Sequence, residues 1–201
     1  MFASYFPRKD QLRAEQMMTP HEYLLSHRIL FLYGIIDEYI KRFDAFGPTL
    51  VMDLLISLDK ENNAPIKLVI DSPGGYINTG FALLDTIRTI KSPVRTYGRN
   101  VQSMGVMLLA AGEKGHRYVY PNSRIMLHLP IAQLSGSSED IKMQQKEVEF
   151  LKEKIVDVLI ECGAKKKKKD ILKDIDREFW LSAKEGIEYG IVDQIISIGD
   201  L

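Results

Sequence analysis

Apolar residues in this chain form short continuous runs that alternate with segments of helical spacing. Ile29–Tyr33 and Ile66–Ile70 are nearly continuous apolar runs, typical of strands that are buried on both faces. Residues 50–58 and 78–90 instead place their apolar side chains on one side of a helix. This order of strand, helix, strand and helix predicts repeated βα units, and therefore an α/β fold with a mostly parallel sheet.

The second half of the chain continues the pattern. We expect a strand at Val94–Tyr97, a buried helix at Met104–Gly112, two short strands at His116–Tyr120 and Ile125–His128 separated by Pro121–Ser123, and a closing strand at Ile191–Ile198. A capping box at Ser182 and Glu185 predicts a short helix that runs toward Tyr189. The lysine run Lys165–Lys169 is typical of a solvated turn or helix edge.

A long helix is predicted from Glu139 to about Cys162, with Gly163 as its stop signal. Its helical spacing is carried by Ile141, Val148, Leu151, Ile155 and Leu159. A helix of this length exceeds what a compact βα core needs, so we expect part of it to project toward another subunit. Residues 1–22 lack a clear period and are interpreted as a loosely ordered arm before one folded domain, 23–201, and residues 37–46 are weakly helical.

Composition narrows the possible functions. The 201 residues are 45% hydrophobic and 27% charged, with a formal net charge of +0, so there is no excess of cations for nucleic-acid binding. We expect no membrane span and no signal peptide, because no apolar run is long enough for either. We also expect no metal, because the four histidines are not paired, and no cofactor. The lone Cys162 excludes an internal disulfide and favours a reducing, cytoplasmic setting.

Ser103 is the first candidate for chemistry, because it stands between a predicted strand and a predicted buried helix. Free backbone N–H groups at a helix start favour negative charge, and the attack of a nucleophilic serine creates an oxyanion. The simpler interpretation is a helix-capping serine.

Two further features fit a nucleophile at this position. The turn Asp71–Gly75 follows a strand with two glycines, so the Gly75 and Met104 amides together could bind an oxyanion, although most such glycine pairs are only turns. His128, at a predicted strand end, is placed to act as a general base toward Ser103, although a single histidine is more often structural.

Four blocks of sequence, in this order, closely resemble the Clp protease proteolytic subunit. They are Asp71–Gly75, Ser103–Gly112, Pro121–His128 and Leu181–Asp193, and the resemblance extends from about Tyr23 to the C-terminus. It implies a serine peptidase of the Clp/crotonase fold, with Ser103 as nucleophile, His128 as base and Gly75 and Met104 as oxyanion donors.

The resemblance also implies an assembly. Seven subunits would form a ring, and two rings would stack into a tetradecamer through the helix at 139–162, the handle. Unfolded polypeptides would be delivered by a separate AAA+ unfoldase that uses the ATP, since this chain has no phosphate-binding loop of its own. The loop Ile131–Gly136 would pair with an extended substrate.

This sequence also departs from the family. Glu178 stands where the family has the aspartate of its catalytic triad, with Asp176 and Asp174 as possible substitutes, and Lys67 and Val69 replace tyrosines used for docking the ATPase. The N-terminal axial segment of the family is not recognisable in residues 1–20. Two alternatives therefore stand beside the peptidase: a weakly active or non-catalytic ring subunit that assembles with an active paralogue, and a crotonase-type acyl-CoA enzyme.

Overall fold

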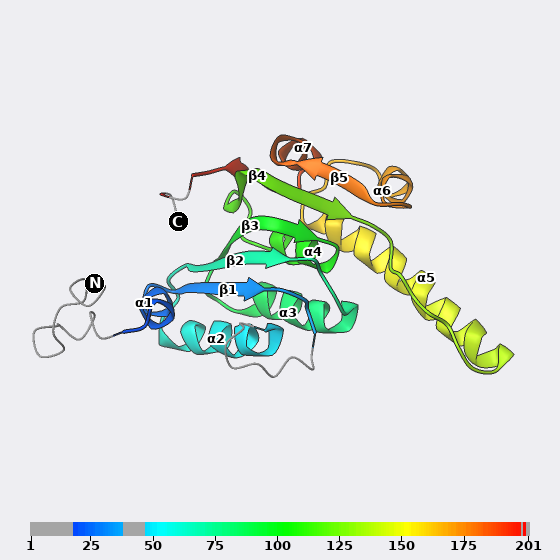
Figure 1. Cartoon of the computed structure of the whole chain (residues 1–201), viewed down its shortest axis with the longest axis horizontal. Coiled ribbons are helices and arrows are strands. Elements are labelled where there is room, and N and C mark those ends of the chain that lie inside the picture. The colour runs from blue at the N-terminus through cyan, green and yellow to red at the C-terminus, as the bar shows by residue number, and fades with distance from the viewer. Residues whose placement is uncertain (1–17, 38–46, 198, 200–201) are drawn as a thin grey trace, which may run out of the picture.

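The computed structural model describes residues 18–37, 47–197 and 199, and these residues form a mixed α/β structure (Figure 1). The strands are β1 (Ile29–Tyr33), β2 (Ile66–Ser72), β3 (Val94–Gln102), β4 (Arg117–Leu127), β5 (Phe179–Ser182) and β6 (Gln194–Ile195). The helices are α1 (Pro20–Ser26), α2 (Pro48–Glu61), α3 (Ile77–Thr89), α4 (Met104–Ala110), α5 (Ser138–Glu161), α6 (Lys168–Asp174) and α7 (Ala183–Tyr189).

The sheet has the strand order β1-β2-β3-β4-β5, and β6 also pairs with β4. Strands β1 to β4 are parallel neighbours, whereas β5 runs antiparallel to β4. Helices connect the parallel strands, because such strands cannot be joined by a tight turn. The predicted βα order and mostly parallel sheet are therefore confirmed.

The two strands expected around Pro121–Ser123 are one irregular strand, β4. Gly98 of β3 pairs with Val119, and Asn100 pairs with Arg124, so the intervening part of β4 falls out of register with β3. The polar, proline-containing break in the sequence marks this irregularity and not the end of a strand. The beginning of β4 pairs with β6 and its end pairs with β5.

The strand predicted at Ile191–Ile198 is wrong over most of its length, because β6 contains only Gln194 and Ile195. The N–H groups of Ile191 and Val192 donate to the carbonyl of Gly186 and so complete the end of α7. Their apolar side chains are buried, which explains why the segment resembles a strand in sequence.

The N-terminal predictions fall largely outside the described residues, which include neither 1–17 nor 38–46. The end of the predicted arm is the beginning of α1, where Thr19 and Glu22 form a capping box. Of the weakly helical segment predicted at residues 37–46, only Asp37 is described.

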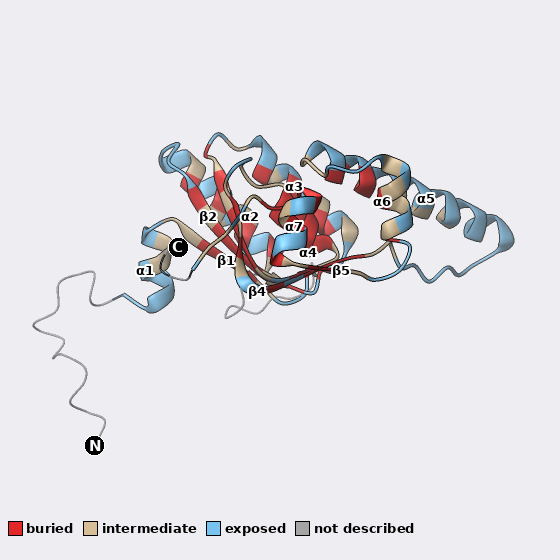
Figure 2. Cartoon of the chain, turned by 90° about the horizontal axis from the view of Figure 1, so that it is seen from above, coloured by how far each residue is buried: buried red, intermediate tan, exposed pale blue. Residues whose placement is uncertain are grey.

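The main core lies between the sheet and the helices on one of its faces (Figure 2). A smaller cluster of Phe31, Val69 and Tyr97 is buried on the opposite face. Helix α5 matches its predicted bounds within one residue, and its buried residues, Ile155, Val156, Val158 and Leu159, all lie near its C-terminal end. Its N-terminal part extends beyond the sheet and is exposed, as expected from its length (Figures 1 and 2).

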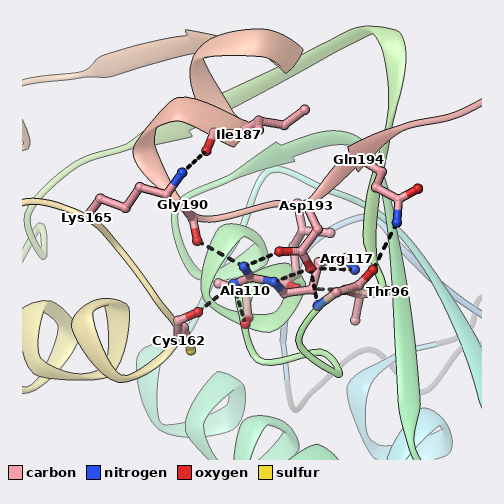
Figure 3. Close-up of polar contacts among 11 residues, drawn as sticks. Thr96, Ala110, Arg117, Cys162, Lys165, Ile187, Gly190, Asp193 and Gln194 are labelled. Carbon is pink, nitrogen blue, oxygen red and sulfur yellow. Dashed lines mark hydrogen bonds and ion pairs between the residues drawn. The ribbon is translucent and has the colours of Figure 1, made fainter.

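One buried cation joins the ends of three helices (Figure 3). The Arg117 side chain is 3% exposed and donates to the carbonyls of Cys162 at 2.6 Å, Gly190 at 3.1 Å and Ala110 at 3.4 Å. It also donates through two nitrogens to the carboxylate of Asp193, at 2.7 and 2.9 Å. Burial opposes ionisation of Asp193, but the hydrogen bonds from Arg117 outweigh it and hold the pKa of this carboxyl below its usual range.

We expect Arg117→Met to lower the free energy of unfolding by about 3–5 kcal/mol, because it leaves the partly buried Asp193 carboxylate without its cation and three helix-end carbonyls without this donor. Urea unfolding at one protein concentration measures this change. The control is Arg95→Met, which removes a half-exposed ion pair with Glu113 and should cost about 1 kcal/mol or less. Equal costs for the two variants would contradict the role given to Arg117.

The contribution of Asp193 to the free energy of unfolding should depend on pH in a defined direction. Because the pKa of Asp193 is lowered by folding, its contribution is present above the unfolded pKa of about 3.9 and is lost as the pH falls through the folded pKa. The stability difference between the parent and Asp193→Asn should therefore shrink below about pH 4.

Candidate active site

Ser103 lies between β3 and α4 in a backbone conformation that is rare for residues with a side chain, with φ 51° and ψ −121°. It occupies the N-cap position of α4, but its hydroxyl makes no capping hydrogen bond. Its N–H donates to the carbonyl of Met126 at 2.7 Å, which fixes the junction to β4. Such a conformation costs of order 1–3 kcal/mol and persists only where its surroundings hold it, as at many functional sites.

The glycine turn after β2 packs directly against this junction. Gly74 has φ +90°, and a Cβ atom at Gly74 would lie 2.7 Å from Cβ of Ser103 and 2.9 Å from the Met104 nitrogen. Gly75 has φ +154°, and a Cβ atom there would overlap the backbone of Ile36. Both glycines are therefore required by close backbone contact, and the turn lies beside Ser103 as predicted.

The two proposed oxyanion donors are the N–H groups of Gly75 and Met104. Within the described ranges, neither N–H donates to a backbone or side-chain acceptor of the chain. Met104 is the first residue of α4, where a helix leaves its N–H groups unpaired. These two donors are available to a bound ligand.

His128 follows β4 directly and is half-buried. It lines a narrow pocket together with Ser103 and Met104, so three residues predicted from the sequence meet at one place. The other lining residues are Ile77, Met107, Leu127, Pro130 and Ile155. In the part of the chain that the structure describes, no hydrogen bond joins the Ser103 hydroxyl to the His128 ring.

Glu178 is exposed, and its Oε2 accepts a hydrogen bond from Nε1 of Trp180 at 3.1 Å. Among the two other candidate carboxylates, Asp174 accepts from Lys166 at 2.6 Å and from the Tyr189 hydroxyl at 3.2 Å, and Asp176 is exposed. No hydrogen bond from a described carboxylate to His128 is present. The third member of the triad therefore stays a prediction.

Glu178 and His128 lie just beyond the last paired positions of β5 and β4. Leu127 of β4 pairs with Phe179 of β5, so the next positions outward along the two strands are His128 and Glu178. Beyond this point the chains diverge, because the N–H of Leu129 donates to the carbonyl of Ile175.

Sequence reasoning missed several residues of this site. Trp180 carries no signal of its own in the sequence beyond its position two residues after Glu178. Ile155 reaches the pocket from α5, and its helical spacing in the sequence gives no sign of this. The sequence indicates Gly74 only as part of the turn, but it is the glycine that packs against Ser103.

Neither a metal site nor a membrane-spanning helix is found in the described ranges. There, no group of three or more His, Cys, Asp or Glu side chains is arranged to hold a metal ion. None of the helices in that same part has the length and apolar character required to cross a membrane.

Comparison with known proteins decides the family. A family model described as Clp protease matches residues 12–199. This chain belongs to the Clp protease family. It is 37% identical over 190 residues to ATP-dependent Clp protease proteolytic subunit 2 of Chlamydia trachomatis and to proteolytic subunit 1 of Chlamydia felis, covering 94% of this chain and 90% of each relative. Proteolytic subunit 2 of Chlamydia pneumoniae is 36% identical over the same length.

Family membership confirms the fold class and the enzyme class expected from the sequence. The chain is a peptidase of the Clp type, and the family implies the serine type. Neither the non-catalytic ring subunit nor the acyl-CoA enzyme is favoured by these comparisons.

We expect Gly74→Ala to lower peptidase activity by about 100-fold or more, because the new methyl group would displace Ser103 and the Met104 amide, and a shift of about 1 Å can cost this much. Gly115→Ala is a matched control, since Gly115 has φ +89° and nothing within 4 Å of the added Cβ. The two glycines have nearly the same φ, so both variants place an alanine in the same unfavourable backbone region. A difference between them in the hydrolysis of a fluorogenic peptide therefore reports the contact with Ser103. Equal activity in the two variants would show that the contact is unimportant.

Proposed function

We propose that this chain hydrolyses unfolded polypeptides with Ser103 as nucleophile and His128 as general base. The observation that carries the proposal is the pocket that brings these two side chains together, with the Gly74–Gly75 turn packed against Ser103. A serine in a strained junction between a strand and a helix keeps its hydroxyl free for attack.

The chemistry follows from this arrangement. Oγ of Ser103 attacks the peptide carbonyl while His128 removes the hydroxyl proton, and the negative oxygen of the tetrahedral intermediate accepts hydrogen bonds from Gly75 and Met104. His128 then gives the proton to the leaving amine, so the C–N bond breaks and an acyl-enzyme remains. Water, deprotonated by His128, attacks the acyl-enzyme and restores Ser103.

Glu178 is proposed as the carboxylate that orients the imidazole and stabilises its protonated form. The end of the β4–β5 pairing supports this role, because its last pair is Leu127 with Phe179 and His128 and Glu178 are the next residues of the two chains. Asp174 is a weaker candidate, since its carboxylate already binds Lys166 and Tyr189.

The segment Ile131–Gly136 is proposed to bind the substrate backbone. This segment follows the pocket residue Pro130, lies outside every described strand, and exposes 86% of Ile131. An extended peptide that pairs with it would gain main-chain hydrogen bonds and place its scissile bond near Ser103.

Family membership implies a ring assembly that works with an ATPase partner. We propose two stacked heptameric rings, a tetradecamer, joined through α5. The exposed apolar side chains of Ile141, Met143 and Phe150 on α5 support this, because a lone subunit would leave them in water. ATP would be used by a separate AAA+ unfoldase, and the single cysteine fits a reducing, cytoplasmic compartment.

We expect Ser103→Ala to abolish labelling by a fluorophosphonate and to lower peptide hydrolysis by several orders of magnitude. The matched control is Ser182→Ala, another serine at a helix start, whose hydroxyl donates to Glu185 at 2.6 Å. This control should lose about 1 kcal/mol of stability and keep its labelling. If the Ser103→Ala variant is still labelled, another residue is the nucleophile.

The proposed assembly is tested at the exposed end of α5. Met143 is 64% exposed, and we expect Met143→Asp to shift the particle toward smaller species, because a charge would enter the apolar contact between rings. Gln145→Asp, an equal charge change at an exposed polar position of α5, should leave the size unchanged. Light scattering that shows the same mass for Met143→Asp and the parent would remove α5 from the proposed interface.

A further inference from the structure

Trp180 holds the carboxylate that is proposed for the triad. Its Nε1 donates to Oε2 of Glu178 at 3.1 Å, and its side chain remains 39% exposed. The guanidinium of Arg124, on β4, lies 5.6 Å from the centre of the indole ring and covers one of its faces. A cation over an aromatic face stabilises the position of the ring, so the indole N–H is presented to Glu178 in a defined direction.

The alternative partner of this carboxylate is adjacent. Met126 pairs with Trp180 and Leu127 pairs with Phe179, so His128 and Glu178 are the next positions along the same two strands. Paired residues of antiparallel strands have Cβ atoms about 5 Å apart, and a glutamate side chain is long enough to span such a distance one step past the last pair. We infer that the carboxylate has two donors within reach: the indole that holds it and the imidazole of His128.

We propose that Trp180 is a positioning residue that competes with His128 for the Glu178 carboxylate. In the described arrangement the indole holds the carboxylate, and the triad is completed when the carboxylate moves to the imidazole. This inference rests on the proposed function, because it assumes that His128 is the general base.

The competition is expected to be weak and to change during the reaction. The indole is a neutral donor, whereas His128 becomes a cation when it takes the proton of Ser103, and hydrogen bonds between charged groups are about twice as strong. The carboxylate therefore favours His128 in the transition state and Trp180 before it. Arg124, over the indole, also interacts with Glu185 on α7, whose pKa is lowered first by hydrogen bonds from Ser182 and further by the charge of Arg124. Asp176 and Arg177, the charged residues directly before Glu178, are both exposed.

The test is Trp180→Phe in the assembled protein, which removes the N–H donor and keeps an aromatic ring beneath Arg124. We expect kcat to rise about three- to tenfold, the effect of one hydrogen bond, with KM unchanged. The acid limb of the pH–rate profile should move to higher pH, because a carboxylate on the imidazole stabilises its protonated form. An unchanged or lower kcat would overturn the proposal.

A double variant tests whether the expected gain in kcat depends on Glu178. In the Glu178→Gln background, Trp180→Phe should give no further gain, because no carboxylate is left to release. A gain of the same size in both backgrounds would show that Trp180 acts through something other than Glu178, and the proposal would fail.

Fluorescence tests the contact without catalysis. Trp180 is the only tryptophan in the chain, so its emission reports on this position alone. We expect the emission to change as Glu178 is protonated, and this transition to be absent in Glu178→Gln. If Ser103 is not labelled by a fluorophosphonate, the proposed function fails while this titration still reports the contact; if the titration shows no step that depends on Glu178, the further inference fails by itself.

Discussion

The arrangement of this subunit depends on the buried guanidinium of Arg117. The C-terminal ends of α4, α5 and α7 converge on Arg117, which donates to a carbonyl from each of them. A helix leaves its last carbonyls unpaired and carries partial negative charge at this end, so three such ends can meet in the interior only around a cation. Asp193 balances the remaining charge and aligns the guanidinium through two hydrogen bonds.

This junction links the core to the candidate site. Helix α4 begins next to Ser103 and ends at Ala110, so a donor at its last turn fixes the position of its first turn about 10 Å away. Helix α5 contributes Ile155 to the pocket and is fixed at Cys162 in the same way. The strained backbone of Ser103 is maintained because both ends of α4 are held, one by Arg117 and the other by Met126 and the glycine turn.

Local signals in the sequence predicted the elements, and tertiary contacts explain the errors. The capping box at Ser182 and the long apolar spacing of α5 depend on near neighbours, so both helices are recovered within a residue. The irregularity of β4 and the short length of β6 depend on partners far along the chain. Ile191 and Val192 are apolar because they are buried at the end of α7, and burial alone does not distinguish a strand from a turn.

Some residues of the candidate site can also be predicted from the sequence, whereas the hydrogen-bond partner of Glu178 cannot. The sequence predicts Ser103, Met104 and His128, and the three line one pocket because backbone junctions place them and backbone junctions follow from element order. The partner of Glu178 is instead set by a side-chain rotamer, which the order of the elements does not fix, and here the carboxylate accepts from Trp180. A glutamate has one more rotatable bond than the aspartate that stands at this position in the family. In the competition that we propose, this longer reach lets one carboxylate bind either Trp180 or His128. The departure from the family residue and the hydrogen bond to Trp180 are then one feature, because the longer side chain gives the carboxylate a second partner.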